Sequence, residues 1–140
     1  MREILFRGKT ARDPEWIYGD LLHDGFDYDV AIWEEKNKLV TAIQPQTVGQ
    51  FTGRTDKNGK KVFEHDILQT FTVWADGTVE KGGIGIVQWW EHDQCYVLVT
   101  KEGYHIDDFG NLGRPEYYEV IGNIHDNPEL LGGADNDRNS

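Results

Sequence analysis

Residues 84–100 read IGIVQWWEHDQCYVLVT and carry a clear strand–turn–strand pattern. Apolar and aromatic residues fill 84–90 and 95–100, and the polar stretch 91–94 between them has the length of a hairpin connection. Short runs of the same kind recur along the chain, separated by turn signals roughly every 8–12 residues. No segment shows a helical period over about 11 residues or more. The sequence therefore predicts a mainly β protein of small antiparallel strands with little helix.

Further strands are expected on both sides of this hairpin. The pattern predicts them at 4–7, 16–22, 28–33, 39–43, 67–74 and 117–124, with the turn Asp76-Gly77 leading to 78–79. Gly82 and Gly83 are expected to interrupt the strand that leads on to residue 84. Residues 47–66 and 101–116 are polar and rich in glycine, which predicts mainly loops. One helical turn is expected after Asn127-Pro128.

Length, composition and charge exclude several classes of protein. The chain has 140 residues, about the size of one domain, and its 25 Asp and Glu against 14 Lys and Arg give a net charge of −11. No apolar run approaches the ~20 residues of a membrane span, and the N-terminus lacks a secretory pattern, so we expect a cytoplasmic protein. The single cysteine, Cys95, excludes an internal disulfide framework and a multi-thiolate zinc site.

Positive charge is concentrated around the turn signal Asn58-Gly59, at Arg54, Lys57, Lys60 and Lys61. Nucleic-acid binding requires a continuous basic face because counterion release drives it, whereas residues 67–131 carry a net charge of −8. We interpret the cluster as a solvated turn that keeps a hairpin soluble. The alternative is a regulatory module that contacts nucleic acid through these four cations.

Histidines beside carboxylates suggest a metal site, since imidazole and carboxylate suit zinc, manganese or iron. Two Glu-His-Asp triplets occur, at 64–66 and 91–93, and a His-Asp pair follows at 125–126. Adjacent residues of a strand point to opposite faces, and the sequence has no His-x-His or His-x-x-x-His pair. We therefore predict no metal and no other cofactor. A metal-dependent enzyme using His65, His92 or His125 is the least favoured hypothesis.

No nucleophile is arranged for catalysis either. The one serine is Ser140, outside any Gly-x-Ser-x-Gly motif, and Cys95 opens an apolar strand, where a structural role is the default. We therefore predict that the protein is not an enzyme.

Aromatic residues offer a candidate interaction surface. Trp89 and Trp90 are adjacent on a predicted strand and so face opposite ways, which predicts that one lies in the core and the other is exposed or at an interface. In an acidic setting, exposed aromatics favour a protein partner or self-association over nucleic acid. The candidate surface residues are Trp16, Trp33, Trp89, Trp90 and Tyr118.

Five motifs in a fixed order resemble the YopX family of phage and prophage proteins, and the resemblance covers residues 1–131. They are Phe6-Arg7-Gly8-Lys9, Trp16-Ile17-Tyr18-Gly19, the stretch 47–53, the stretch 56–67, and the stretch 119–124 followed by 127–131. The resemblance implies a β-rich N-terminal part at 1–46 and an SH3-type barrel at 47–131. Independently of it, the composition of residues 132–140 predicts a disordered tail. The resemblance also implies carriage by a phage or prophage of a Gram-positive host, and it implies no activity.

One departure from the family pattern concerns the turn before residue 67. The family usually has glycine where this chain has His65, so a positive φ at this position would strain the histidine. Asp66, which follows, is expected to accept backbone N–H groups from the preceding loop. The acidic composition, the paired aromatics, the absence of a catalytic arrangement in the sequence and the family resemblance together predict a non-enzymatic phage accessory protein. It is expected to act through protein–protein contacts or self-association.

Overall fold

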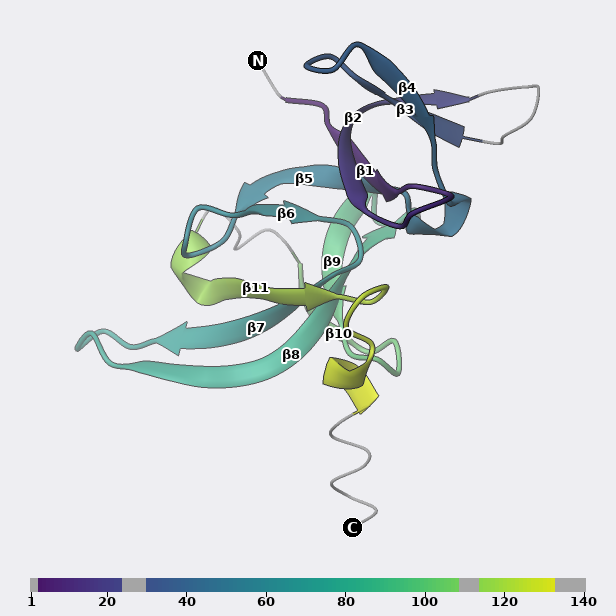
Figure 1. The fold of residues 1–140 in the computed structure, drawn as a ribbon. Coiled ribbons are helices and arrows are strands. Elements are labelled where there is room, and N and C mark those ends of the chain that lie inside the picture. The colour runs from purple at the N-terminus through teal and green to yellow at the C-terminus, as the bar shows by residue number, and fades with distance from the viewer. Residues whose placement is uncertain (1–2, 24–29, 109–113, 133–140) are drawn as a thin grey trace. The chain divides into compact units, whose positions relative to one another are not determined.

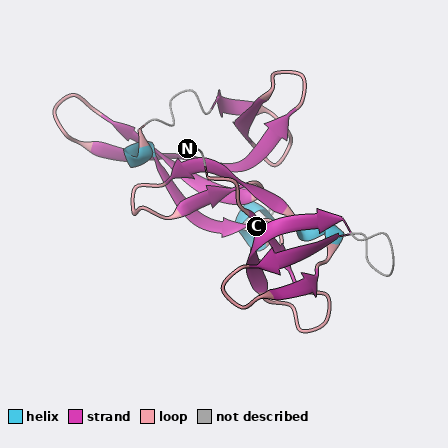
Figure 2. Cartoon of the chain, turned by 90° about the horizontal axis from the view of Figure 1, so that it is seen from above, coloured by secondary structure: helices cyan, strands magenta, loops and turns pink. Residues whose placement is uncertain are grey.

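The computed structural model describes residues 3–23, 30–108 and 114–132. Strands make up most of these residues, and helix is confined to short turns (Figure 2). The prediction of a mainly β protein is therefore confirmed. The chain divides into two compact units, Met1–Gly53 and Arg54–Ser140 (Figure 1). In the described part of the chain, no helix combines the length and the apolar character that a membrane crossing requires.

An antiparallel sheet organises the first unit. Its order is β4-β3-β2-β1-β5-β6, and the pairs from β4 to β5 lie in this unit. Residues of one sheet face form a core of Ile17, Val30, Ile32 and Ile43, with Leu21 and Val48 packed against it. The elements are β1 (Phe6–Lys9), β2 (Trp16–His23), β3 (Val30–Glu34), β4 (Leu39–Ala42), the 3-10 turn η1 (Pro45–Thr47) and β5 (Gly49–Thr55).

A second antiparallel sheet, of order β10-β9-β8-β7-β11, organises the second unit. Its central strands are covered on both faces, because neighbouring residues of β8 belong to different core clusters. Val87 joins Leu68 and Leu98, whereas Ile86 joins Val97 and Val99. The elements are β6 (Lys61–Phe63), β7 (Asp66–Val73), β8 (Val79–Trp90), β9 (Cys95–Val99), β10 (His105–Asp108), the 3-10 turn η3 (Pro115–Tyr117) and β11 (Tyr118–Asn123).

Three predictions about loops were wrong. Residues 47–66 contain β5 and β6, and residues 101–116 contain β10. These short strands are held by pairing with partners distant in sequence, such as Gln50 with Phe6, which a local pattern does not reveal. The glycines at 82 and 83 do not interrupt β8 either.

A β-bulge explains why β8 continues through Gly82 and Gly83. The β7–β8 register shifts between Gln69 and Phe71, which places an extra residue on β8. The side chain of Gln69 donates Nε2–H to the Gly82 carbonyl at 2.8 Å, and the Thr70 hydroxyl donates to the Gly83 carbonyl at 2.8 Å. These side chains replace the ladder bonds that the bulge breaks, so the strand bends without ending.

The C-terminal turn follows the expected pattern. Residues 129–132 form a helical turn after Asn127-Pro128, with the Gly132 N–H donating to the Pro128 carbonyl at 3.2 Å. The tail predicted at 132–140 lies, from residue 133 on, outside the described residues.

Candidate functional site

The distal part of the β7–β8 hairpin, residues 71–81, forms an arm in the second unit. Phe71–Val73 pairs with Val79–Lys81, whereas the pairing of β11 with β7 begins only at Thr70. Figure 1 accordingly shows β7 and β8 continuing side by side past the end of β11. The arm is therefore a two-stranded ribbon that leaves the sheet at the bulge.

The tip of the arm is held by local hydrogen bonds and exposes apolar groups. Asp76 accepts the Thr78 backbone N–H at 2.9 Å and also the Thr78 hydroxyl, and the Gly77 N–H donates to the Trp74 carbonyl at 2.9 Å. These bonds from Thr78 lower the pKa of Asp76. Trp74 is 52% exposed and Val79 is 54% exposed, so the ribbon presents a large aromatic and an aliphatic side chain to solvent.

One edge of β8 has no strand partner among the described residues. Val79–Gly85 pairs with β7 alone, because the pairing with β9 begins at Ile86 and Val99. Beyond Val99 the chain turns, with the Gly103 N–H donating to the Thr100 carbonyl at 2.9 Å. In the part of the chain that the structure describes, no strand therefore pairs with the edge of β8 beside the bulge that faces away from β7.

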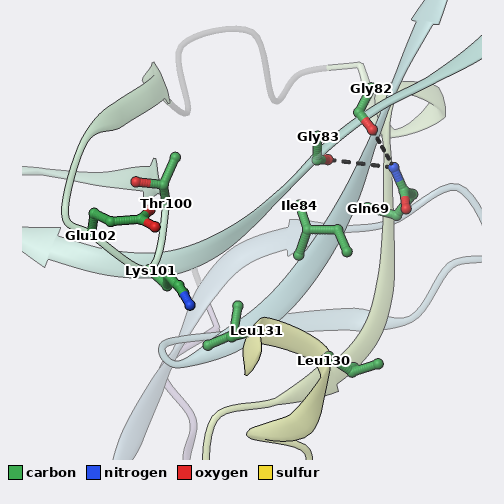
Figure 3. A pocket seen from close by; sticks show the side chains of 9 residues that line it. All are labelled: Gln69, Gly82, Gly83, Ile84, Thr100, Lys101, Glu102, Leu130 and Leu131. Atoms are coloured by element: carbon green, nitrogen blue, oxygen red, sulfur yellow. Dashed lines mark hydrogen bonds between the residues drawn. The ribbon is translucent and has the colours of Figure 1, made fainter. Parts of the chain in front are cut away.

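A pocket of about 420 Å³ lies beside this edge of β8 (Figure 3). Its apolar lining comes from Ile84 of β8 and from Leu130 and Leu131 of the C-terminal turn, and Lys101 and Glu102 add one charge of each sign. The volume is in the range of about 300–1,000 Å³ that is typical of ligand sites. The remaining lining residues are Gln69, Gly82, Gly83 and Thr100.

Trp89 and Trp90 lie on opposite faces of β8. Trp89 is 39% exposed. Its ring packs edge-on against Tyr96 at 5.0 Å between centroids and donates Nε1–H to Glu91 at 2.8 Å. Trp90 packs against the cluster of Ile86, Val97 and Val99. Trp89 is therefore the more exposed of the two tryptophans. Strand alternation alone does not predict which of the two faces solvent.

The other candidate surface residues are more enclosed. Tyr118 is only 3% exposed and belongs to a core cluster, so it offers no surface for a partner. In the first unit, the Arg7 guanidinium lies 4.6 Å from the centre of the Trp16 ring. Trp33 donates Nε1–H to Glu35 at 2.9 Å. The Lys38 ammonium, followed by this indole N–H, lowers the pKa of Glu35.

All four candidate nucleic-acid contacts are exposed: Lys57 and Lys60 lie in the turn between β5 and β6, Arg54 lies near the end of β5 and Lys61 is the first residue of β6. The turn is organised from within by Asp56, which is 2% exposed and accepts the backbone N–H groups of Asn58 and Lys60, each at 2.9 Å. The Lys57 ammonium lies over the Phe71 ring, 4.3 Å from its centre. The conformation of this turn is therefore set by the buried Asp56 carboxylate, and the Lys57 ammonium packs on an aromatic ring of the same protein.

The two Glu-His-Asp triplets occupy different environments. His92 lies in the turn between β8 and β9, with its side chain 99% exposed and Nδ1 at 3.1 Å from Asp93. Asp66 is buried and accepts the Phe63 N–H at 2.7 Å, as expected for a carboxylate that closes a turn. His65 has a φ of 75°, so the conformation that suits glycine is present at this position. The described residues contain no group of three metal-ligating side chains.

The structure brings together two histidines that the sequence analysis treated as belonging to separate motifs. His65 and His125 come together from two turns, with the His125 Nε2 at 3.4 Å from the His65 Nδ1. The pocket and the open edge of β8 were also missed, because they depend on where β9 ends and where the C-terminal turn packs. The one sequence signal was the apolar pair Leu130-Leu131 directly after a predicted helix start.

Comparisons with known proteins identify a similar solved structure and a matching family. A search of curated proteins finds no match. The crystal structure of protein EF1440 from Enterococcus faecalis is similar with a TM-score of 0.58 and 22% identity, covering 94% of this chain and 99% of that chain. The family model described as YopX protein matches residues 5–132. The chain therefore belongs to the YopX family.

Proposed function

We propose that this chain is a non-enzymatic phage or prophage accessory protein of the host cytoplasm that binds another protein. The second unit would act as an SH3-type roll that takes an extended segment of the partner. The observation that carries the proposal is the open edge of β8 at Val79–Gly85, which runs beside an apolar pocket. An exposed strand edge can add a strand from a partner, with main-chain bonds giving affinity and pockets giving specificity.

The partner segment has a chemistry that the site defines. Ile84, Leu130 and Leu131 would hold one bulky apolar side chain in the pocket, while the backbone of the segment pairs along β8. Residues 67–131, which include the sheet, carry a net charge of −8, so a basic segment is favoured by charge complementarity. Trp74 and Val79 on the arm extend the contact beyond the pocket.

The test uses the full chain as bait in host-cell lysate, with and without nuclease. Leu130→Asp and Ile84→Asp place a charge in the pocket, and Leu39→Asp serves as a matched control because Leu39 is 53% exposed on β4 of the other unit. We expect a captured protein that survives nuclease, is lost with both pocket variants and is retained with Leu39→Asp. Circular dichroism checks that each variant is folded.

Two outcomes would overturn the proposal. If both pocket variants still capture the partner, the partner does not bind at this edge of β8. Capture that disappears with nuclease would instead support nucleic-acid binding through Arg54, Lys57, Lys60 and Lys61. Hydrogen exchange provides a direct reading, since strand addition should slow exchange of the amides of Val79–Gly85 when the captured partner is bound.

A further inference from the structure

Two histidine rings meet in the second unit from turns that are 60 residues apart in sequence. His65 lies in the turn between β6 and β7, and His125 lies in the turn that follows β11. The His125 Nε2 is 3.4 Å from the His65 Nδ1, the ring centroids are 5.3 Å apart, and the ring planes are inclined at 82°. Both residues are partly buried.

Backbone hydrogen bonds fix both turns in place. The His65 N–H donates to the Val87 carbonyl at 2.8 Å, and the His65 carbonyl accepts the Ile124 N–H at 3.0 Å. The side chain of Asn123 accepts the N–H groups of His125 and Asp126, at 3.0 and 2.9 Å. The two imidazoles are therefore brought together by folding, so little further ordering is needed for both to act on one ligand.

The separation of the two ring nitrogens fits a shared metal ion. A nitrogen-to-acceptor hydrogen bond usually spans about 2.7–3.2 Å, so the two rings make a long hydrogen bond at 3.4 Å when no metal is bound. Two nitrogens at about 2.0–2.1 Å from a tetrahedral zinc ion are about 3.3–3.4 Å apart. Ring centroids in such a site are about 5.2 Å apart by the same geometry, and the observed value is 5.3 Å.

We propose that His65 and His125 form a two-imidazole site for a divalent transition metal. The described residues supply no third His, Cys, Asp or Glu to this pair, so water or a donor group of another molecule would complete the coordination shell. Imidazole favours copper, nickel and zinc, and binding follows the order of intrinsic affinity with copper tightest. Magnesium, which prefers oxygen ligands, does not bind here.

Metal binding at this site links two turns that are distant in the chain and therefore stabilises the second unit. Metal at about a hundredfold excess over its Kd raises the Tm by roughly 8 °C for a chain of this size. Both imidazoles must be neutral to bind the metal, so the effect is lost in acid.

The experiment measures thermal unfolding of the tag-free full chain with zinc, nickel, copper or magnesium chloride, each metal added alone. The variants are His65→Gly, which fits the backbone at φ 75°, and His125→Gln. The control is His92→Gln, whose side chain is 99% exposed in another turn. We expect zinc and nickel to raise the Tm of the wild type and of His92→Gln by several degrees. Neither metal should change the Tm of His65→Gly or of His125→Gln.

A second measurement does not depend on stability. Paramagnetic nickel should broaden the ring signals of His65 and His125 in NMR spectra at lower concentration than those of His92. The proposal is overturned if the wild type shows neither the Tm rise nor selective broadening. It is equally overturned if His92→Gln loses the response while His65→Gly keeps it.

Discussion

The side chain of Asp56 accepts a hydrogen bond from the backbone N–H of Val120, which is 64 residues away in the sequence, at 2.9 Å. Its other oxygen accepts the N–H groups of Asn58 and Lys60 in its own turn. One buried carboxylate thus shapes the β5–β6 turn and ties it to the start of β11.

Asp56→Ala should destabilise the protein by about 3 kcal/mol, because three backbone N–H groups lose a charged acceptor. Urea unfolding followed by fluorescence measures the change. Asp93→Ala is the matched control, since Asp93 is exposed in the 91–94 turn, and it should change the stability by less than about 0.5 kcal/mol. Equal effects of the two substitutions would refute the role assigned to Asp56.

Two glycines of β8 should respond oppositely to a methyl group. A Cβ at Gly85 would lie 2.4 Å from Leu98 Cγ in the core, whereas a Cβ at Gly83 meets nothing within 4 Å. Gly85→Ala should therefore cost about 2 kcal/mol by overpacking. Gly83→Ala should be neutral or stabilise by up to about 1 kcal/mol by restricting the unfolded chain. The free energy of unfolding in urea distinguishes them, and a costless Gly85→Ala would contradict the close packing of Leu98.

The backbone at His65 should prefer glycine. With φ at 75°, a residue with a Cβ is strained by about 1 kcal/mol relative to glycine. His65→Gly should therefore be more stable than His65→Ala by about that amount, measured with a chelator present so that bound metal plays no part. Both variants lose the same imidazole, so their difference isolates the backbone. A more stable alanine variant would show that the turn changes conformation.

The tip of the arm should respond to acid. The Thr78 hydroxyl and N–H lower the pKa of Asp76, so these bonds favour the ordered turn above the usual range of an aspartate and are lost as pH falls through the lowered value. An NMR titration of the Asp76 carboxyl should give a midpoint below that of an ordinary aspartate. Thr78→Val should move this midpoint upward, and an unchanged midpoint would rule out the hydroxyl as its cause.

Sequence reasoning predicted those features that depend on neighbouring residues. The turns at 35–38, 76–77 and 91–94 form where polar or Asp-Gly connections separate apolar runs. Asp66 accepts a backbone N–H from the preceding turn as expected. His65 adopts the positive φ that the family's usual glycine suggested. In each case the deciding chemistry lies within a few residues.

Features that depend on long-range placement were beyond the sequence. Gln50 lies in a strand that pairs with Phe6 of β1, and the stretch around it has no clear alternation. The meeting of His65 with His125 requires β11 to lie against β7 in one particular register. The pocket likewise depends on β9 ending at Val99 while β8 continues. Strand propensity does not predict which distant strands pair.

Beyond the bulge at Gly82-Gly83, the arm lies outside the hydrophobic clusters that form the core of the second unit. Among the described residues, neither core cluster of the second unit includes a side chain from 71–81. Changes of length at the Asp76-Gly77 tip would therefore leave the packed interior untouched, as loop insertions at exposed hairpin tips generally do. A foreign peptide grafted there would be displayed on a two-stranded stalk, which makes this small protein a ready scaffold for epitope presentation.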